Sequence, residues 1–334
     1  MVEAHIEERQ LLPNGILSHP SWTMYDSSKV QAFMECPRKY FYRYVLGWDN
    51  EQPSIHLIFG EGWHRAMAIL LREGYTREAV EQGYAAFEAY YRESFGPEQD
   101  ELMHPKSPGG ALSALIQYAQ FYAKIDHFKV LFTEVAGSVP INEVDRLSFR
   151  LDALVEDQDG KKLLEHKTGS RNDNAWSAQW RLSMQVRTYT HVMNCLYPPE
   201  EIWGALINGT FFYKDKCAFL RVPVRTSIGS MNAWLFTANY WVGQIKGEHQ
   251  ALEMCSPSEP VLEAFPMNTC NCTKYGICQH MDHCEAWANP LQHLEHRPTS
   301  MVERWWDPAK ENEKGAQKVV HISLDSITQG DSVE

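Results

Sequence analysis

Two acidic side chains and a lysine are spaced so that a β-hairpin would place them on one face. They are Asp152, Glu165 and Lys167, in the segment FRLDALVEDQDGKKLLEHKTG that runs from residue 149 to residue 169. Two carboxylates at such short range repel each other unless a proton or a cation lies between them. Carboxylate oxygens suit Mg²⁺ or Mn²⁺, and a lysine beside them can orient or deprotonate a water molecule. The alternative is an exposed hairpin face with an incidental ion pair.

The turn of this hairpin decides which side chains face one another. Asp159–Gly160 is a strong two-residue turn signal, and with that centre Asp152 lies opposite Lys167 and diagonal to Glu165. If the centre is Gln158–Asp159 instead, Asp152 faces Glu165 directly. Either register leaves the two carboxylates and the lysine on one face of the sheet, within reach of one another.

Four further side chains could serve the same site. His64 ends the sequence GEGWH at a glycine-rich entry into a predicted amphipathic helix, although a lone histidine is more often structural. Gln185 and Tyr189 are four residues apart, so they share one face of the helix predicted after the hairpin. Arg181 lies one turn earlier on that face, where its guanidinium could bind a phosphate.

Five of the eight cysteines favour a metal over disulfides. The start of the chain, MVEAHIEERQ, lacks the apolar stretch of a secretory signal, so we expect a reducing compartment in which thiols stay free. Cys36 precedes Pro-Arg near the N-terminus, whereas Cys270, Cys272, Cys278 and Cys284 lie near the C-terminus. Four thiolates suit an iron–sulfur cluster or zinc.

The spacing of these cysteines favours iron–sulfur. A zinc ribbon normally contains two closely spaced cysteine pairs, and Cys270-x-Cys272 is too tight for the usual form. Five thiols compete for four places, so either Cys270 or Cys272 is spare. Because the even spacing of the last three cysteines starts at Cys272, we expect Cys272 to be the ligand.

The periodicity of apolar residues predicts an α/β fold that holds these side chains in place. Period-two stretches predict strands over 129–141, in the hairpin, and over 205–215 and 217–224. Helical periodicity predicts helices on both sides of these strands, including a long one over 175–197. We expect a lead-in at 1–24, a single domain at 25–288 (a helical part at 25–128, a catalytic core at 129–228, a helix plus the cysteine cluster at 229–288) and a polar tail at 289–334.

Charge and composition limit the classes of function. The chain of 334 residues is 44% hydrophobic with a formal net charge of −12, which argues against a protein that coats nucleic acid with its whole surface. Positive charge is concentrated in two segments: residues 29–43 carry four basic side chains against one acid, and residues 161–187 carry six against two. No apolar run approaches the length of a membrane span. We therefore expect an intracellular protein. The charge distribution is compatible with a phosphate-binding groove on an acidic body, although exposed runs of charge are usually only solvated faces.

The spacing of these motifs resembles that of the PD-(D/E)XK nuclease superfamily. Asp152 is followed after twelve residues by Glu165-x-Lys167, although Leu151 stands where the name of the superfamily has proline. Gly60 to His64 is similar to the Gly-x-x-x-His element of the RecB-like branch, and Gln185 and Tyr189 to its Gln-x-x-x-Tyr element. One early cysteine with three late ones resembles the iron–sulfur staple of the AddB nuclease domain and of CRISPR-associated Cas-four-type exonucleases. The resemblance covers about three quarters of the chain, from Cys36 to Cys284.

This resemblance implies a restriction-endonuclease-like core, in which a mixed central sheet is flanked by helices. A helical N-terminal region and a cysteine-rich C-terminal segment would close a 4Fe–4S cluster. The implied activity is hydrolysis of DNA phosphodiester bonds by an exonuclease that uses Mg²⁺ or Mn²⁺. Its implied substrate is single-stranded DNA or duplex ends, in the cytoplasm of a bacterial, archaeal or phage-infected host cell. The implied setting is repair or recombination, CRISPR adaptation with its protein partners, or phage DNA metabolism.

The resemblance also implies a role for each residue. Asp152, Glu165, His64 and the carbonyl of His166 would hold the metal, and Lys167 would position or activate the water. Gln185 and Tyr189 would orient the substrate strand. The predicted cluster ligands are Cys36, Cys272, Cys278 and Cys284. The predicted DNA contacts are Arg181, Arg38, Lys39 and Arg187, with Lys29 and Arg43 as weaker candidates.

Two other functions compete with this interpretation. A non-catalytic iron–sulfur protein could keep the same fold to bind DNA or to act as a scaffold, because a fold does not determine a function. A zinc-binding interaction module with an incidental hairpin is the second alternative. Iron rather than zinc in the purified protein would exclude the second, and DNA cleavage would exclude the first.

Overall fold

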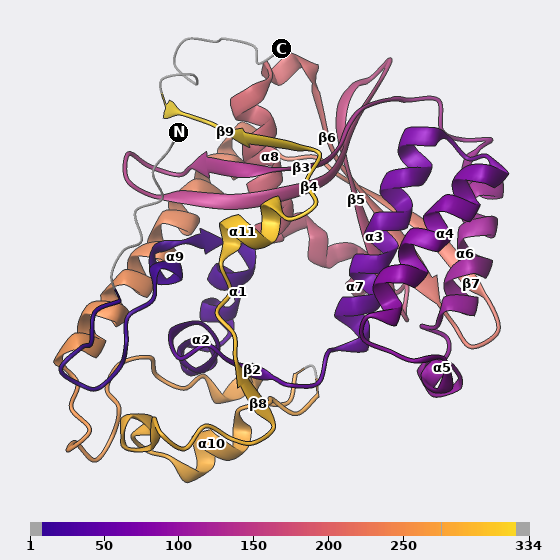
Figure 1. The fold of residues 1–334 in the computed structure, drawn as a ribbon. Coiled ribbons are helices and arrows are strands. Elements are labelled where there is room, and N and C mark those ends of the chain that lie inside the picture. The colour runs from indigo at the N-terminus through magenta and orange to yellow at the C-terminus, as the bar shows by residue number, and fades with distance from the viewer. Residues whose placement is uncertain (1–8, 275, 325–334) are drawn as a thin grey trace. The chain divides into compact units, whose positions relative to one another are not determined.

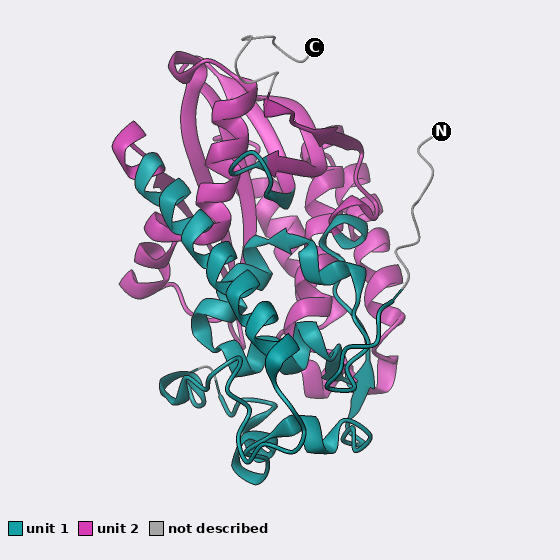
Figure 2. Ribbon diagram, turned by 90° about the vertical axis from the view of Figure 1, so that its left-hand side faces the viewer, with its two compact units in different colours: residues 1–52, 140–149, 232–311 teal, residues 53–139, 150–231, 312–334 magenta. Residues whose placement is uncertain are grey.

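The computed structural model describes residues 9–274 and 276–324 and divides into two compact units (Figures 1 and 2). Unit 1 consists of residues 1–52, 140–149 and 232–311, and unit 2 of residues 53–139, 150–231 and 312–334. The predicted lead-in and polar tail each lie partly outside the described residues.

Unit 2 contains a mixed β-sheet in the order β7-β6-β5-β4-β3-β9. β4 and β5 are antiparallel, β5 and β6 are parallel, β6 and β7 are antiparallel, and β3 and β9 are parallel. The strands are β3 (Lys129–Pro140), β4 (Arg146–Asp157), β5 (Gly160–Gly169), β6 (Ile202–Phe212), β7 (Cys217–Val224) and β9 (Lys318–His321). This mixed sheet with helices packed on it agrees with the predicted restriction-endonuclease-like core.

The hairpin of β4 and β5 adopts the second of the two predicted registers. Ala153 pairs with Leu164 and Asp157 with Gly160, so the turn is centred on Gln158–Asp159. The side chain of Asp157 accepts a hydrogen bond from the backbone N–H of Asp159 (3.0 Å), which favours a turn one residue earlier than Asp-Gly would give. In this register Asp152 and Glu165 occupy facing positions on neighbouring strands.

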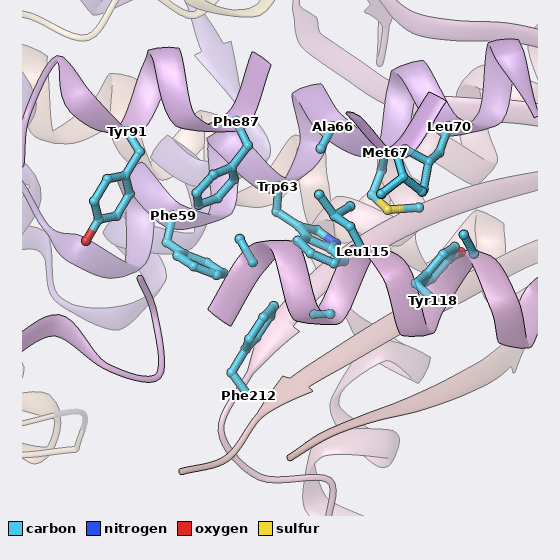
Figure 3. Packing of buried hydrophobic residues seen from close by; sticks show 14 of the residues in the cluster. Phe59, Trp63, Ala66, Met67, Leu70, Phe87, Tyr91, Leu115, Tyr118 and Phe212 are labelled. Carbon is cyan, nitrogen blue, oxygen red and sulfur yellow. The ribbon is translucent and has the colours of Figure 1, made fainter. Parts of the chain in front are cut away.

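Helices α3, α4 and α6 of unit 2 pack around an aromatic core (Figure 3). Trp63 of α3 is fully buried and contacts Phe212 at the end of β6, with ring centroids 5.4 Å apart. Gly62 lets α4 approach, because a Cβ there would lie 2.9 Å from the ring of Phe87. The helices of this unit are α3 (Ile55–Glu73), α4 (Arg77–Arg92), α5 (Asp100–Met103), α6 (Pro108–Tyr122), α7 (Asn174–Gln179) and α8 (Met184–Leu196). Burial of Trp63 fixes the direction of its neighbour His64.

The helix predicted over 175–197 is instead interrupted. The structure has α7, a short 3₁₀ turn η4 (Trp180–Leu182) and then α8. Ser183 has an extended backbone, and its hydroxyl accepts from the N–H of Val186, so this residue caps a new helix. Arg181 therefore lies on η4, and the prediction that it shares a helical face with Gln185 is wrong.

Unit 1 is mostly helical. Asp26 caps its first helix by accepting a hydrogen bond from the N–H of Lys29 (2.7 Å), and Cys36 separates α1 from α2 where Pro37 opens a new turn. Its elements are β1 (Tyr25–Asp26), α1 (Ser27–Glu35), α2 (Pro37–Tyr40), a π-helix (Phe41–Val45), β2 (Trp48–Asn50), most of α9 (Ile228–Met254), α10 (Met281–Ala286), β8 (Met301–Glu303) and the start of α11 (Pro308–Glu313). β1 pairs in parallel with Leu147 and Ser148 of β4, and β2 is antiparallel to β8. Within the described part of the chain, no helix is both long and apolar enough to cross a membrane.

The region expected to be a polar tail contributes two strands in its described part. β8 pairs with β2 in unit 1, and β9 pairs with β3 in unit 2 through the register Val135↔Lys318 to Ser138↔His321. Gly137 makes the second pairing possible, because a Cβ there would lie 1.7 Å from the carbonyl oxygen of Val320. Both strands are four residues or shorter, which is too short for periodicity to identify them.

Candidate active site

Asp152 of β4 and Glu165 of β5 lie side by side and are almost completely buried, with 7% and 1% of their surface exposed. The regular pairing between these strands ends at Ala153–Leu164. Beyond it, Oδ2 of Asp152 accepts a hydrogen bond from the backbone N–H of His166 at 2.7 Å. The side chain of Asp152 thus accepts the hydrogen bond that a backbone carbonyl of β4 would accept in a regular sheet. This bond holds the carboxylate of Asp152 against β5.

His64 reaches this pair of carboxylates from α3. Its Nδ1 atom lies 2.9 Å from Oδ1 of Asp152. Burial lowers the pKa of His64, but the Asp152 carboxylate outweighs burial and raises that pKa to about 9. Burial alone would raise the pKa of Asp152, yet the charge of His64 holds it well below its usual range. An imidazolium and an ionised carboxylate therefore face each other here.

Glu165 carries the feature that most suggests a cation. Its Oε1 atom accepts from Nζ of Lys167 at 2.7 Å, whereas its Oε2 atom is buried without a hydrogen-bond partner among residues 9–274 and 276–324. Burial, followed by repulsion from Asp152, raises the pKa of Glu165 to about 7. A divalent cation would remove this repulsion and satisfy the unpaired oxygen, so the residues fit Mg²⁺ or Mn²⁺.

Lys167 is held between the second carboxylate and α8. Besides Glu165, its Nζ atom donates to Oε1 of Gln185 at 2.9 Å, and Nε2 of Gln185 donates to the hydroxyl of Tyr189 at 2.9 Å. Burial lowers the pKa of Lys167, but Glu165 and Asp152 raise it above the usual value, so the group is an ammonium ion. The structure thus brings together His64 and all five predicted catalytic side chains in unit 2.

Sequence reasoning missed a third buried carboxylate near Asp152. Glu134 of β3 is 5% exposed, and its Oε2 atom lies 2.6 Å from Nε of Arg150. Burial and then repulsion from Asp152 raise the pKa of Glu134 to about 7. Its φ of 49° lies in the left-handed region, where strained residues at functional sites are often found. An acid inside the otherwise apolar run KVLFTEVAG was the signal that could have identified it.

A polar network behind the site was also missed. His166, between the two catalytic residues of β5, is 1% exposed, and burial lowers its pKa to about 3, so its imidazole is neutral. Its Nδ1 atom lies 2.9 Å from Nδ2 of Asn208 on β6, whose Oδ1 atom accepts from Nε of Arg221 at 3.2 Å. Arg221 in turn makes a bidentate ion pair with Asp126. The predicted metal contact through the His166 carbonyl stays a prediction.

Replacing Asn208 by leucine is expected to destabilise the protein by about 1–3 kcal/mol. The amide is fully buried, and its loss leaves His166 and Arg221 each with one fewer partner. Unfolding in urea, followed by circular dichroism, measures the difference. The matched control is Asn172→Leu, since Asn172 is exposed and accepts a single hydrogen bond from the hydroxyl of Tyr213. Equal stability of the two variants would show that the network does not contribute to the free energy of unfolding.

A family model described as the PD-(D/E)XK nuclease superfamily matches residues 27–225, which is more than half of the chain. The chain belongs to the PD-(D/E)XK nuclease superfamily. The matched region contains His64, Asp152, Glu165 and Lys167 and ends before Cys270. The likeness to nucleases therefore rests on the part of the chain that builds the buried carboxylate site.

Two other comparisons add little to the superfamily match. The curated proteins contain no match to this chain. Among solved structures, the crystal structure of SSO0001 matches with 16% identity and a TM-score of 0.27, over 54% of this chain and 74% of that chain. A TM-score at that level supports no inference about this chain.

The cysteines predicted to bind iron all belong to unit 1, and three of the four lie beyond the residues that the family model matches. The N–H of Cys278 donates to the carbonyl of Cys272 (2.8 Å), and Sγ of Cys36 accepts from the N–H of Asn268 (3.4 Å). Burial and then repulsion from Cys36, Cys278 and Cys272 raise the pKa of Cys284 to about 12, against the opposing charge of Arg38. Four crowded thiols are a donor set that fits an iron–sulfur cluster.

Neither these four cysteines nor the side chains around Asp152 and Glu165 are already arranged as a metal site. Over residues 9–274 and 276–324, no group of three or more His, Cys, Asp or Glu side chains is arranged to hold a metal ion. Cys270 is exposed, whereas Cys36, Cys272, Cys278 and Cys284 are half-buried. Which of Cys270 and Cys272 is the ligand stays a prediction.

Burial argues against two of the predicted DNA contacts. Arg38 is 2% exposed, and its guanidinium donates to the carbonyls of Phe265 (2.9 Å) and Leu262 (3.1 Å) in unit 1. Arg187 is 7% exposed and donates to the carbonyls of Arg181 and Ser230 in unit 2. Both guanidinium groups hold backbone in place, so they are not presented to a phosphate.

The remaining basic candidates differ in how they are presented. Lys29 is fully buried, and its Nζ atom donates to the carbonyls of Ser21 and Met24, which removes it from consideration. Lys39 is partly exposed in an ion pair with Glu35 (3.2 Å). Arg181 is exposed on η4, directly before α8 with its Gln185. Arg181 is thus the predicted DNA contact that the structure best presents to solvent.

Proposed function

We propose that this member of the PD-(D/E)XK nuclease superfamily is a DNA exonuclease that depends on Mg²⁺ or Mn²⁺. The observation that carries the proposal is the pair of buried carboxylates, Asp152 and Glu165. One oxygen of Glu165 has no hydrogen-bond partner in the part of the chain that the structure describes, and the ammonium group of Lys167 lies 2.7 Å from the other. Such a pair is costly as structure alone, because each charge raises the free energy of the other. As a cation site beside a positively charged donor, the same arrangement suits phosphodiester hydrolysis.

The residues divide the work of hydrolysis. Asp152, Glu165 and His64 would hold the metal, which when bound lowers the pKa of water and stabilises the negative charge that develops on phosphate. Lys167 orients the attacking water or a phosphate oxygen through its N–H donors, and Gln185 fixes the ammonium group from α8. Water adds to phosphorus and the P–O bond to the leaving nucleoside breaks, which yields a phosphate monoester and a hydroxyl group.

Three buried groups keep this geometry fixed before substrate arrives. Asn208 holds His166, whose N–H holds Asp152, and Glu134 adds negative charge that Arg150 neutralises. Catalysis benefits because a site held in place by its surroundings loses little free energy to reorganisation during the reaction. A left-handed backbone is unfavourable for a residue in a strand. The strained backbone of Glu134 is therefore consistent with a residue whose position serves the site.

We propose that four cysteines of unit 1 bind a 4Fe–4S cluster with a structural role. Cys36, Cys272, Cys278 and Cys284 would supply the thiolates, and Cys270 would stay free. The cluster would cross-link the start of unit 1 with a segment more than 230 residues later, which stabilises that unit as a long-range cross-link does. By its chemistry the enzyme would serve DNA repair or recombination, CRISPR adaptation or phage DNA metabolism, together with protein partners of that pathway.

Cleavage of labelled DNA tests this function. The iron-replete protein is incubated with single-stranded and duplex DNA in Mg²⁺, in Mn²⁺ and in a chelator, under reducing conditions. We expect cleavage with either metal, mononucleotide or short products released from an end, and no cleavage in the chelator. Absence of cleavage with both metals would favour the non-catalytic DNA-binding or scaffold function instead.

A further inference from the structure

An aromatic side chain lies beside Lys167 and takes no part in the chemistry described so far. Trp180 opens η4, and Nζ of Lys167 is 5.7 Å from the centroid of its ring. The ring is half-buried, and its Nε1 atom is covered and lacks an acceptor within residues 9–274 and 276–324. The part of the indole that reaches solvent is therefore hydrocarbon, which is the surface that a nucleobase stacks on.

Trp176 of α7 holds Trp180 in place. The two indoles meet edge to face, with centroids 5.4 Å apart, and Trp176 packs on Phe211 of β6 at 4.7 Å. Gly209 provides the room, because a Cβ at this position would lie 2.4 Å from Cη2 of Trp176. Gly209 is also the residue that pairs with Lys167 across β5 and β6. The tryptophan pair is thus seated on the sheet at the level of the catalytic lysine.

The backbone around Trp180 is held in place, and the next residue carries an exposed cationic side chain. Nη2 of Arg187 donates to the carbonyl of Arg181 at 3.1 Å and ties η4 to α8. The side chain of Arg181 is exposed, and that of Leu182 is 77% exposed. A rigid aromatic ring next to an exposed guanidinium group combines base stacking with phosphate attraction, which is how proteins bind unpaired nucleic acid. In a duplex the faces of internal bases are already stacked and cannot reach such a ring.

We propose that Trp180 is a stacking platform for one unpaired base of the DNA strand, next to the phosphate that Lys167 contacts. This inference rests on the proposed nuclease function and narrows its substrate to single-stranded DNA or the frayed ends of a duplex. Trp176 positions the platform and does not touch DNA. Arg181 binds the phosphate on the far side of the stacked nucleotide.

Binding of a fluorescein-labelled oligothymidylate of about 12 nucleotides tests the platform. The dissociation constant (Kd) is measured by anisotropy in a chelator, which prevents cleavage. We expect Trp180→Ala to raise Kd roughly 5- to 150-fold and Trp180→Phe to raise it less, because phenylalanine can still stack. Trp203→Ala is the matched control, since Trp203 packs against Lys162 and Arg225, six residues or ~20 Å along β6 from Gly209. Its Kd is expected to equal that of the wild type.

A series of oligonucleotides, each with one abasic site, locates the stacked base. In the wild type, one position raises Kd more than its neighbours do, and in Trp180→Ala that sensitivity disappears. If Trp180→Ala does not fold, Trp180→Leu removes the aromatic ring while keeping an apolar side chain, and the same loss is expected.

Two results would overturn the proposal, and they differ in what else they overturn. If the wild type binds and cleaves single strands but Trp180→Ala and Trp180→Leu bind them equally well, the platform is refuted and the nuclease function stands. If the wild type neither binds nor cleaves DNA with Mg²⁺ or Mn²⁺, both proposals fail together.

Discussion

Asp152→Asn is expected to lower the rate of DNA cleavage by more than about 100-fold and to weaken Mg²⁺ binding. Asparagine keeps the shape of the side chain and can still accept the N–H of His166, but it removes the charge shared by His64 and the metal. The change therefore separates the electrostatic role of Asp152 from its structural one. Cleavage of a labelled strand measures the rate, and the dependence of thermal stability on Mg²⁺ measures binding.

Thermal stability gives a readout that does not need DNA. Mg²⁺ at 100 times its Kd stabilises a protein by about 2.7 kcal/mol if it binds only the folded state. The wild type should show such a shift, and Asp152→Asn should show much less. Asp159→Asn removes the same charge from the exposed turn of the same hairpin and serves as the control. A wild-type shift in Asp152→Asn, with undiminished cleavage, would exclude this carboxylate as a ligand.

Cys278→Ala is expected to abolish iron binding and to destabilise the protein by more than about 4 kcal/mol, as loss of a structural metal centre does. The cluster is assigned to unit 1 and the carboxylates to unit 2, so we expect the chemistry of any folded fraction to be unchanged. Iron analysis and visible absorbance measure the first effect, thermal unfolding measures the second, and cleavage of labelled DNA measures the third. Zinc in place of iron in the wild type would refute the iron–sulfur assignment.

Cys270→Ala is the matched control for this substitution, because it removes an exposed thiol two residues from Cys272. Its iron content and stability are expected to equal those of the wild type. Retained iron and stability in Cys278→Ala would contradict the ligand set. Loss of iron in Cys270→Ala would show instead that Cys270 is a ligand and Cys272 is spare.

Local sequence signals were sufficient where the chemistry depends on neighbouring residues. The alternation of the hairpin placed Asp152, Glu165 and Lys167 on one face, and helical spacing aligned Gln185 with Tyr189, which the structure joins by a hydrogen bond. The choice between two registers was left open by the turn signal alone. The register depends on the hydrogen bond that the Asp157 side chain accepts from the N–H of Asp159, and strand propensity takes no account of such a bond.

Contacts between distant segments were not accessible from the sequence. Asn208 and Glu134 join the site only because β6 and β3 lie near β5 and β4 in the sheet order. Arg38 and Arg187 looked like exposed phosphate contacts because a charged side chain is seldom buried, yet carbonyl groups from distant segments bind both. The break before α8 depends on Ser183, whose capping role competes with helix continuation without changing the apolar period.

The comparison of wild type with Lys167→Ala in one cleavage assay tests the central claim most directly. Iron-replete protein, Mg²⁺ or Mn²⁺ and labelled single-stranded DNA are used for both, with Lys161→Ala as control because Lys161 lies on the same strand in ion pairs with Glu156 and Glu201. We predict that Lys167→Ala cleaves about 10²- to 10⁴-fold more slowly than the wild type and that Lys161→Ala cleaves at the wild-type rate. Equal cleavage by the wild type and Lys167→Ala would contradict the assignment of this site as the nuclease centre.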